Sequence, residues 1–560
     1  MRKIISILAI ALFFATCTKK EKITGLIANK AMVVSARVEA SQIGSDILQK
    51  GGNAYDAMIA TQLALAVVYP QAGNIGGGGF LVYRQNDGNT GALDFREKAP
   101  ASAHKDMYLD EKGNVIPEMS SFGVHSVGVP GSIAGIMEVY KKFGSLPFKD
   151  LVQPAIDLAR NGFIVSEMQA RALNGTKERF QKANNYTIAF EGDWKEGDRI
   201  QLEELAQTLE RIRDEGRDGF YKGKTADLMV DYVTELGGKM TLDDLTSYKA
   251  VWRDPIKFNY KGYGITSMTL PASGGICLAQ ILKAIEPYDL SKIEHNSTKY
   301  IQLLTEAERR SYADRAHYLG DIDYVNVPID SLTDTKYINN RMKSFSWEKA
   351  TKSSEISHGT LLGYESNETT HYSIVDSYGN AVSVTTTLNT GYGSKVFVKG
   401  AGFFLNNEMD DFSSKPGTPN VYGLLGSDAN AIAPGKRMLS SMTPTIVEYN
   451  GKLKMVVGTP GGSTIITSVL QNILNVVEYN MGMQESVNAA RFHHQWFPDN
   501  IRMEPNGFDE KTKSKLKALG YELLERNSLI IGRVDAILVL PNGQLEGGAD
   551  PRGDDAAVGF

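Results

Sequence analysis

The sequence predicts a layered globular protein in which helices and strands alternate, an α/β or α+β fold. Segments with the helical spacing of apolar residues alternate with short strand-like segments along the chain, and no internal repeat is visible. The composition agrees, because 42% of the 560 residues are hydrophobic and 22% are charged, as is usual for globular domains. The net charge of −5 argues against a nucleic-acid partner, which would favour clustered positive charge.

Two helices are predicted near the N-terminus of the globular part. Apolar residues recur at helical spacing over 36–50, Gly51-Gly52 suits a C-cap, and Asn53 suits the N-cap of a second helix that ends at Val68. We therefore expect an αα-hairpin, followed by a strand around 80–83. Further helical patterns lie at 132–143, 204–215, 225–236, 276–286 and 298–318.

A polar stretch then divides the chain. Residues 349–368 are rich in Ser, Thr, Lys and Glu, which predicts a solvated loop and either a domain boundary or a processing site. Directly after it, 371–375 and 381–388 predict two strands of a hairpin joined by a turn. The remaining pattern predicts strands at 453–457 and 536–540 and helices at 464–477, 484–491 and 510–519.

The first residues have the pattern of an export signal. Arg2 and Lys3 precede an apolar stretch at 4–14, which is too short to span a bilayer as a helix. We assign 1–17 as a signal peptide. Its end at Cys17 resembles the cleavage box of bacterial lipoproteins, so lipidation of Cys17 and plain secretion with cleavage nearby both remain open. We expect an exported bacterial protein, either periplasmic or associated with the outer membrane as a lipoprotein.

Cysteine usage excludes a disulfide framework. Cys17 and Cys277 are the only two cysteines, so one thiol remains once Cys17 is lipidated or removed. Cys277 lies in an apolar run, and we interpret it as a small buried hydrophobic residue.

Several polar motifs suggest cofactor sites at first sight. The glycine-rich segment at 74–80 lacks the Lys-Ser/Thr ending of a phosphate-binding loop, so it predicts a tight backbone passage beside a site or a plain flexible turn. Glu408, Asp410 and Asp411 lack calcium-loop spacing and are interpreted as a solvated acidic turn. His493-His494 lack the spacing of a helical zinc site. We expect no metal and no cofactor.

The polar loop ends at a hydroxyl residue. A threonine hydroxyl is a poor nucleophile without a base, but an N-terminal threonine carries its own base, the free α-amine. A cut before Thr369 would create this arrangement, and the Thr369 hydroxyl could make the cut itself by attacking the Glu368 carbonyl. From the residues alone, Thr369-Thr370 can equally be β-branched residues that begin a strand.

Several long motifs, in order, resemble those of the γ-glutamyltransferase (γ-glutamyl transpeptidase) family of N-terminal-nucleophile hydrolases, over almost the whole chain after the signal. They are Asn74-Ile75-Gly76-Gly77-Gly78-Gly79-Phe80, Asp94-Phe95-Arg96-Glu97-Lys98-Ala99-Pro100, Thr369-Thr370-His371-Tyr372-Ser373, Thr387-Leu388-Asn389, Asn406-Asn407-Glu408-Met409-Asp410-Asp411-Phe412, Leu439-Ser440-Ser441-Met442, Pro460-Gly461-Gly462-Ser463 and Arg491-Phe492-His493-His494-Gln495-Trp496.

The resemblance implies an α+β fold, a four-layer αββα sandwich built jointly by two subunits of one self-cleaved precursor. Cleavage between Glu368 and Thr369 would give a large subunit, 18–368, and a small subunit, 369–560, which stay together as a heterodimer. Thr369 is then the nucleophile and Thr387 the residue that positions it.

The family's other site residues map onto this chain as well. Gly461 and Gly462 match the pair whose backbone N–H groups form the oxyanion hole. Arg96, with the hydroxyls of Ser440 and Ser441, is expected to bind the α-carboxylate of the γ-glutamyl group, and Asn389, Glu408 and Asp411 its α-ammonium group. Residues 416–427 resemble the family's lid loop, with Tyr422 as the gate. Many bacterial relatives have Gln where this chain has Glu408, and an acid still suits an ammonium group.

The resemblance therefore predicts a cofactor-free γ-glutamyltransferase or glutathione hydrolase. It would transfer the γ-glutamyl group of glutathione or a similar compound through a Thr369 ester to water or to an amino-acid or peptide amine. Relatives that process poly-γ-glutamate or the acyl side chains of β-lactams are alternatives, although the charged residues for a glutamyl head group argue against the latter. An uncleaved, inactive surface lipoprotein that only binds its ligand is the alternative from another class.

Overall fold

The computed structural model describes residues 23–357, 369–415, 417–526 and 530–560, and two seven-stranded antiparallel sheets form its centre. One sheet has the order β1 (Ile27–Ala28), β18 (Leu545–Gly548), β17 (Asp535–Val539), β13 (Lys452–Gly458), β12 (Thr445–Tyr449), β9 (Tyr263–Ser267) and β8 (Ile256–Tyr260). The other has the order β19 (Ala556–Gly559), β2 (Met32–Ser35), β10 (Thr370–Val375), β11 (Ala381–Thr387), β3 (Gly78–Arg84), β4 (Thr90–Asp94) and β7 (Val251–Arg253).

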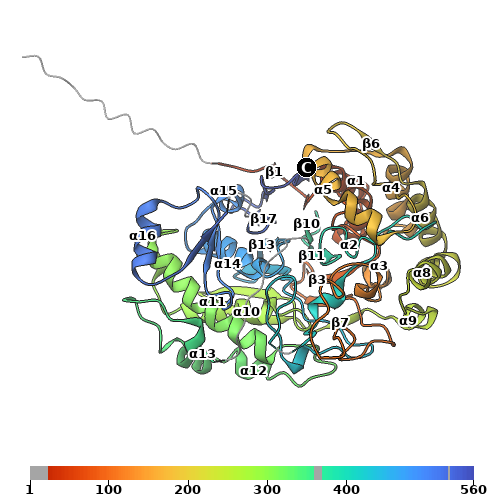
Figure 1. The fold of residues 1–560 in the computed structure, drawn as a ribbon. Helices are drawn as coiled ribbons and strands as arrows, with labels where there is room; N and C mark the ends of the chain where they lie inside the picture. The colour runs from red at the N-terminus through yellow and green to blue at the C-terminus, as the bar shows by residue number, and fades with distance from the viewer. Residues whose placement is uncertain (1–22, 358–368, 416, 527–529) are drawn as a thin grey trace, which may run out of the picture.

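Helices cover the outer face of each sheet, which gives the four layers αββα (Figure 1). The β10 sheet is covered by α1 (Val38–Gln49), α2 (Ala54–Val68), α3 (Ser132–Phe143), α4 (Phe148–Asn161), α5 (Glu167–Ala183), α6 (Glu203–Glu215), α7 (Asp218–Tyr221), α8 (Gly223–Glu235) and α9 (Leu242–Ser247). The β13 sheet is covered by α10 (Gly274–Ile285), α11 (Thr298–Tyr318), α12 (Ile329–Leu332), α13 (Thr335–Met342), α14 (Thr464–Val477), α15 (Met483–Asn488) and α16 (Glu510–Ala518).

Strand periodicity divides the core into two parts. On β3, Leu81 and Tyr83 pack with the α1–α9 layer, whereas Phe80 and Val82 pack with the hydrophobic cluster that includes the second sheet and α10–α16. This alternation is expected because successive strand side chains point to opposite faces. Both faces of the central strands are therefore buried.

The hairpin after the polar loop occupies the middle of its sheet. β10 pairs with β11 so that Thr370 lies opposite Thr386, and β11 pairs with β3 so that Thr387 lies opposite Gly78. The inter-sheet face of this hairpin is polar: His371 and Ser373 lie on β10, and Ser383 and Thr385 on β11. Thr369 precedes β10 and Thr387 ends β11, so both lie at the same end of the hairpin.

The glycine-rich segment is a tight passage, and the flexible-turn interpretation is wrong. A Cβ atom on Gly76 would lie 2.2 Å from the Phe404 carbonyl oxygen, and one on Gly77 would lie 2.0 Å from that of Thr387. Neither backbone leaves space for a side chain. The glycines thus allow the chain to run directly behind Thr387.

Most predicted elements are confirmed. The αα-hairpin is α1 and α2, with Gly51 at a φ of 91° and a capping box at Asn53. The helix predicted at 484–491 is shorter, because α15 ends at Asn488.

Cys277 is buried as expected, and burial raises the pKa of its thiol to about 11. No helix among the described residues is long and apolar enough to cross a membrane. Most of the predicted 349–368 loop, from residue 358 on, and the whole signal segment lie outside the described residues.

Replacing Gly77 tests this passage. We expect Gly77→Ala to lower the free energy of unfolding by about 1–3 kcal/mol, because the new methyl group overlaps the Thr387 carbonyl oxygen. Thermal denaturation followed by circular dichroism measures the effect. Gly175→Ala is the matched control, since Gly175 lies in α5 with no atom within 4 Å of its Cβ position. Alanine there is expected to be neutral or stabilising by up to about 1 kcal/mol. Equal melting temperatures for both variants would contradict the tight passage.

Candidate active site

Two threonine hydroxyls form the centre of the site. Thr369 is 4% exposed, and its Oγ1 lies 3.4 Å from Oγ1 of Thr387. The Thr387 hydroxyl also accepts a hydrogen bond of 2.7 Å from the backbone N–H of Asn389. This hydrogen bond from Asn389 holds the Thr387 hydroxyl beside Thr369. Such an arrangement is expected for a residue that positions a nucleophile.

A neutral histidine connects β10 to the opposite sheet. The ring nitrogens of His371 lie 2.9 Å from the Thr385 hydroxyl and 3.1 Å from the Ser373 hydroxyl. The ring packs so closely on Gly458 that a Cβ there would lie 2.2 Å from Cε1. Burial lowers the pKa of His371 to about 3, so the ring is uncharged. His371 therefore fixes the two strands together and is not placed to act as a base.

The strand beyond Gly458 brings a helix N-terminus to the site. β13 ends at Gly458, and α14 begins at Thr464, whose N–H donates to the Gly461 carbonyl. Gly462 has a φ of 55° and lines the same cleft as Thr369. Among the described residues, no acceptor contacts the Gly462 N–H. Such an N–H group at the positive end of a helix suits a developing oxyanion.

The cleft beside Thr369 has a charged floor. Arg96, Glu408 and Asp411 line it together with Thr369 and Gly462. The buried guanidinium of Arg96 contacts Glu408 and lies 2.5 Å from Asp411. Arg96 and Glu408 are each 1% exposed as side chains. The Arg96 guanidinium thus offers paired N–H donors for a carboxylate, and the two acids offer oxygen atoms for a cation.

Unpaired acceptor atoms face this cleft. Oε2 of Glu408 and Oδ1 of Asn389 are buried without a hydrogen-bond donor among the described residues. Native proteins satisfy nearly all such atoms, so these two indicate where a ligand donor fits. An ammonium group has three N–H donors and matches Glu408, Asn389 and Asp411 together.

Burial and mutual contacts set the charges of these groups. Burial raises the pKa of the Glu408 and Asp411 carboxyl groups, although the neighbouring Arg96 opposes the shift. Burial alone would lower the pKa of Arg96, but Glu408 and Asp411 outweigh it and raise the pKa instead. The guanidinium therefore stays charged, and the pocket is a compact set of opposed charges.

The predicted lid loop lies over the cleft. The Tyr422 hydroxyl donates a 2.5 Å hydrogen bond to the Asn389 carbonyl, and the ring packs where a Gly462 side chain would be. Asp410 accepts from the Val421 N–H at 2.9 Å, and Asn420 donates to Asp411 at 2.9 Å. The loop is thus bonded to the acidic turn that lines the pocket.

Not every predicted residue lines the cleft. Ser441 does, and its hydroxyl accepts from Arg315 at 3.0 Å, but Ser440 instead bonds the Met442 N–H. Gly461 borders α14 without lining the cleft. Glu368 lies outside the described residues.

The interpretation of Glu408, Asp410 and Asp411 as a solvated turn is wrong, because Glu408 and Asp410 are buried against Arg96 and the lid loop. The contacts of Arg315 and His371 were not predicted from the residues. Their burial and their pairing identify them as part of the site, and a single sequence reveals neither property.

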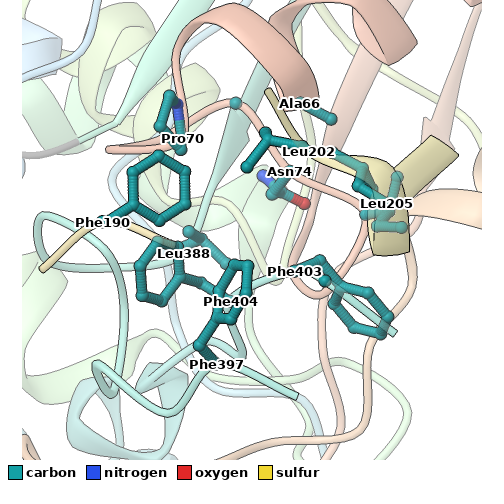
Figure 2. Close-up of a pocket in the computed structure, with 13 residues that line it drawn as sticks. Ala66, Pro70, Asn74, Phe190, Leu202, Leu205, Leu388, Phe397, Phe403 and Phe404 are labelled. Atoms are coloured by element: carbon teal, nitrogen blue, oxygen red, sulfur yellow. The ribbon is translucent and has the colours of Figure 1, made fainter. Parts of the chain in front are cut away.

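A second cavity lies behind Leu388 and has no charged lining. Figure 2 shows the rings of Phe190, Phe397 and Phe404 grouped around Leu388, with Asn74 as the one polar side chain labelled. Asn74 donates to the Thr387 carbonyl at 2.9 Å. The residues that line this cavity support the backbone behind Thr387. None of them has an acidic, basic or nucleophilic side chain.

Together these features define a class of protein. A buried threonine at the start of a central strand, two antiparallel sheets between helical layers, and a helix N-terminus beside the hydroxyl are the features of an N-terminal-nucleophile hydrolase. The family model described as gamma-glutamyltranspeptidase matches residues 40–560. The chain belongs to the γ-glutamyltranspeptidase family of enzymes.

Relatives of known sequence and structure agree with this assignment. The glutathione hydrolase proenzyme of Escherichia coli strain K12 is 47% identical over 538 residues, which cover 95% of this chain and 92% of that protein. The crystal structure of Helicobacter pylori γ-glutamyltranspeptidase has 44% identity and a TM-score of 0.56 over 58% of this chain and 94% of the solved chain. Cephalosporin acylase from Bacillus halodurans shares the fold, with a TM-score of 0.85 at 24% identity over 98% of this chain and 99% of its own.

Adding a methyl group at Gly462 tests the oxyanion position. A Cβ there would lie 2.5 Å from the Tyr422 ring. We expect Gly462→Ala to shift this segment and lower kcat for γ-glutamyl amide hydrolysis at least about tenfold, because oxyanion donors act only in their aligned position. Gly451→Ala is the control: Gly451 also has a positive φ, 72°, but no atom within 4 Å. Its kcat should stay within about twofold of wild type. A similar loss in both variants would assign the effect to backbone strain alone.

Proposed function

We propose that this protein is a self-processing γ-glutamyltransferase and glutathione hydrolase. The observation that carries the proposal is the charged pocket beside Thr369, in which Arg96 lies between Glu408 and Asp411. An amino-acid head group has one carboxylate and one ammonium, and this pocket holds partners for both. Its position next to the Thr369 hydroxyl directs the γ-amide of that head group to the nucleophile.

Maturation precedes catalysis in this proposal. The precursor cleaves between Glu368 and Thr369 into a large subunit, 18–368, and a small subunit, 369–560. Strands of both parts pair within each sheet: β10 of the small subunit pairs with β2 of the large one, and β12 of the small subunit pairs with β9 of the large one. The two subunits therefore stay together as a heterodimer. The 94% coverage of the solved H. pylori chain by 58% of this chain fits separate subunits.

The reaction uses the new α-amine as the base. It takes the proton of the Thr369 hydroxyl as the oxygen attacks the γ-carbonyl carbon, and the oxyanion accepts a hydrogen bond from the N–H group of Gly462, which lines the cleft. The C–N bond then breaks, and the leaving amine receives the proton. Water or an amino-acid or peptide amine attacks the resulting γ-glutamyl ester and restores Thr369.

The rest of the pocket gives specificity for the head group. Arg96 and the Ser440-Ser441 segment bind the α-carboxylate, while Asn389, Glu408 and Asp411 bind the α-ammonium. Tyr422 closes the cleft and excludes water during acylation. These steps require no metal or cofactor, because the α-amine supplies the base and a backbone N–H group stabilises the oxyanion.

We also propose that the protein is exported to the bacterial envelope, as periplasmic enzyme or as a lipoprotein anchored through Cys17. The charged and apolar residues at 1–17 support export. The mass of the mature large subunit distinguishes a lipidated Cys17 from plain cleavage.

Substitution of the nucleophile tests both maturation and mechanism. We expect Thr369→Ala to remain a single chain and to release no glutamate from glutathione, because the hydroxyl that attacks Glu368 and the substrate is gone. Thr369→Ser, which keeps a hydroxyl, should cleave itself into two chains and retain activity. Intact mass, N-terminal sequencing and a glutamate-release assay give the readout. A wild-type protein that stays uncleaved would favour the alternative of an inactive binding protein.

A blocked donor tests the head-group pocket. We expect acetylation of the α-amine of γ-glutamyl-p-nitroanilide to lower kcat/KM roughly 100-fold or more, since it removes the charge and leaves the buried acids of the pocket unpaired. The unblocked compound is the control, and release of p-nitroaniline gives the rate. Equal cleavage of both compounds, or preference for acyl groups without an α-ammonium, would favour an acylase of the β-lactam-processing type.

A further inference from the structure

The residue after Arg96 adds a third acid to the floor of the pocket. Glu97 is 0% exposed, and its Oε2 lies 3.8 Å from the Arg96 guanidinium, too far for a hydrogen bond. Neither oxygen of its carboxyl group has a hydrogen-bond donor among the described residues. A buried ionised carboxylate without donors is costly, so the protonation state of Glu97 requires a physical explanation.

Charge balance gives the first part of that explanation. If all three acids were ionised, Glu97, Glu408 and Asp411 would surround the single guanidinium of Arg96 in a buried site. Such crowding of like charges favours protonation of one member. Two further charged side chains reach the cluster: Arg315 interacts electrostatically with Asp411 and bonds Ser441, and the buried carboxyl group of Asp410 lies near Asp411. The hydroxyls of Tyr221 and Tyr248, which also face Glu97, are neutral because burial raises their pKa.

The contact between two of the acids gives the second part. Glu97 and Glu408 lie within hydrogen-bonding range of each other, and burial raises the pKa of both, that of Glu97 to about 7. The Cβ position of Gly78 lies 2.6 Å from Oε2 of Glu97, so the backbone closes this side of the carboxyl group and excludes other donors. One proton between the two acids supplies the donor that Glu97 lacks.

We propose that Glu97 and Glu408 share one proton, and that Glu97 holds this proton and donates a hydrogen bond when the ionised Glu408 binds the α-ammonium group of the donor substrate. This inference rests on the proposed function, because that function supplies the ammonium. The cation stabilises the ionised form of Glu408, so the shared proton moves from a Glu408 oxygen to a Glu97 oxygen with no change in total charge. Glu97 is thus a positioning residue that acts through Glu408.

Infrared difference spectroscopy tests the protonation directly. Mature wild-type enzyme and Glu97→Gln are compared at about pH 6, below the Glu97 pKa of about 7. We expect the wild type to show the C=O stretch of one additional protonated carboxyl group, shifted in D2O and absent from the variant. Loss of an ionised carboxylate stretch instead would overturn the proposal. This result does not depend on the substrate, so it is separate from a failure of the proposed function.

Steady-state kinetics test the role of the hydrogen bond. The amide introduced by Glu97→Gln is neutral and can still donate an N–H to Glu408, so we expect this variant to keep KM within about twofold of wild type. Glu97→Leu removes the donor and should raise KM about tenfold while kcat changes little. If Glu97 acted as an anion beside Arg96, both variants would raise KM equally, which would contradict the proposal.

Folding controls keep this test decisive. Self-cleavage into two chains and the melting temperature show whether each variant is folded. If Glu97→Leu fails to fold, the comparison of Glu97→Gln with wild type still decides, because a tenfold increase in its KM would refute a neutral Glu97.

Discussion

The register of β10 against β11 is the constraint on which the site depends. Thr370 lies opposite Thr386, so Thr369 comes beside Thr387 at one end of the hairpin. The same register directs His371 to Gly458 on the opposite sheet, from which the chain continues to Gly462 and the N-terminus of α14. A slip of one residue would turn the hydroxyl away from the cleft, since strand side chains alternate between faces. Thr369 and Gly462, the proposed nucleophile and oxyanion donor, are therefore placed by the same pairing.

Local patterns made much of the fold predictable. The Gly51 and Asn53 caps, the hairpin strands and the apolar spacing of α14 depend on neighbours in sequence, and the structure has all of them. α4 and α5 were not predicted. α4 contains Pro154 in its interior, which normally argues against a helix. The order of the strands was not predictable from residues either, because pairs such as β1 with β18 join the two ends of the chain.

The candidate site, like the fold, was predictable from the sequence only in part. A hydroxyl residue where a polar loop becomes a strand suggested Thr369 as a nucleophile, but only the family resemblance distinguished it from a strand-starting residue. The acidic turn at Glu408 was misinterpreted as solvated, since its burial depends on Arg96, which lies more than 300 positions earlier in the chain. Charge alone did not indicate that these groups face one another. Long-range pairing is the information that a single sequence lacks.

The pairing of Arg96 with Glu408 and Asp411 also explains how one pocket can be stable and selective. Buried charges are tolerated when each has a partner, and here the groups expected to bind substrate are partners of one another. In the proposed function, a zwitterionic head group replaces these pairs: its carboxylate binds the Arg96 guanidinium, and its ammonium group binds Glu408 and Asp411. A ligand with only one of these charges would occupy one side and leave the other unpaired. We therefore expect the pocket to select for both charges together, because a ligand that lacks one of them leaves a buried ion unpaired.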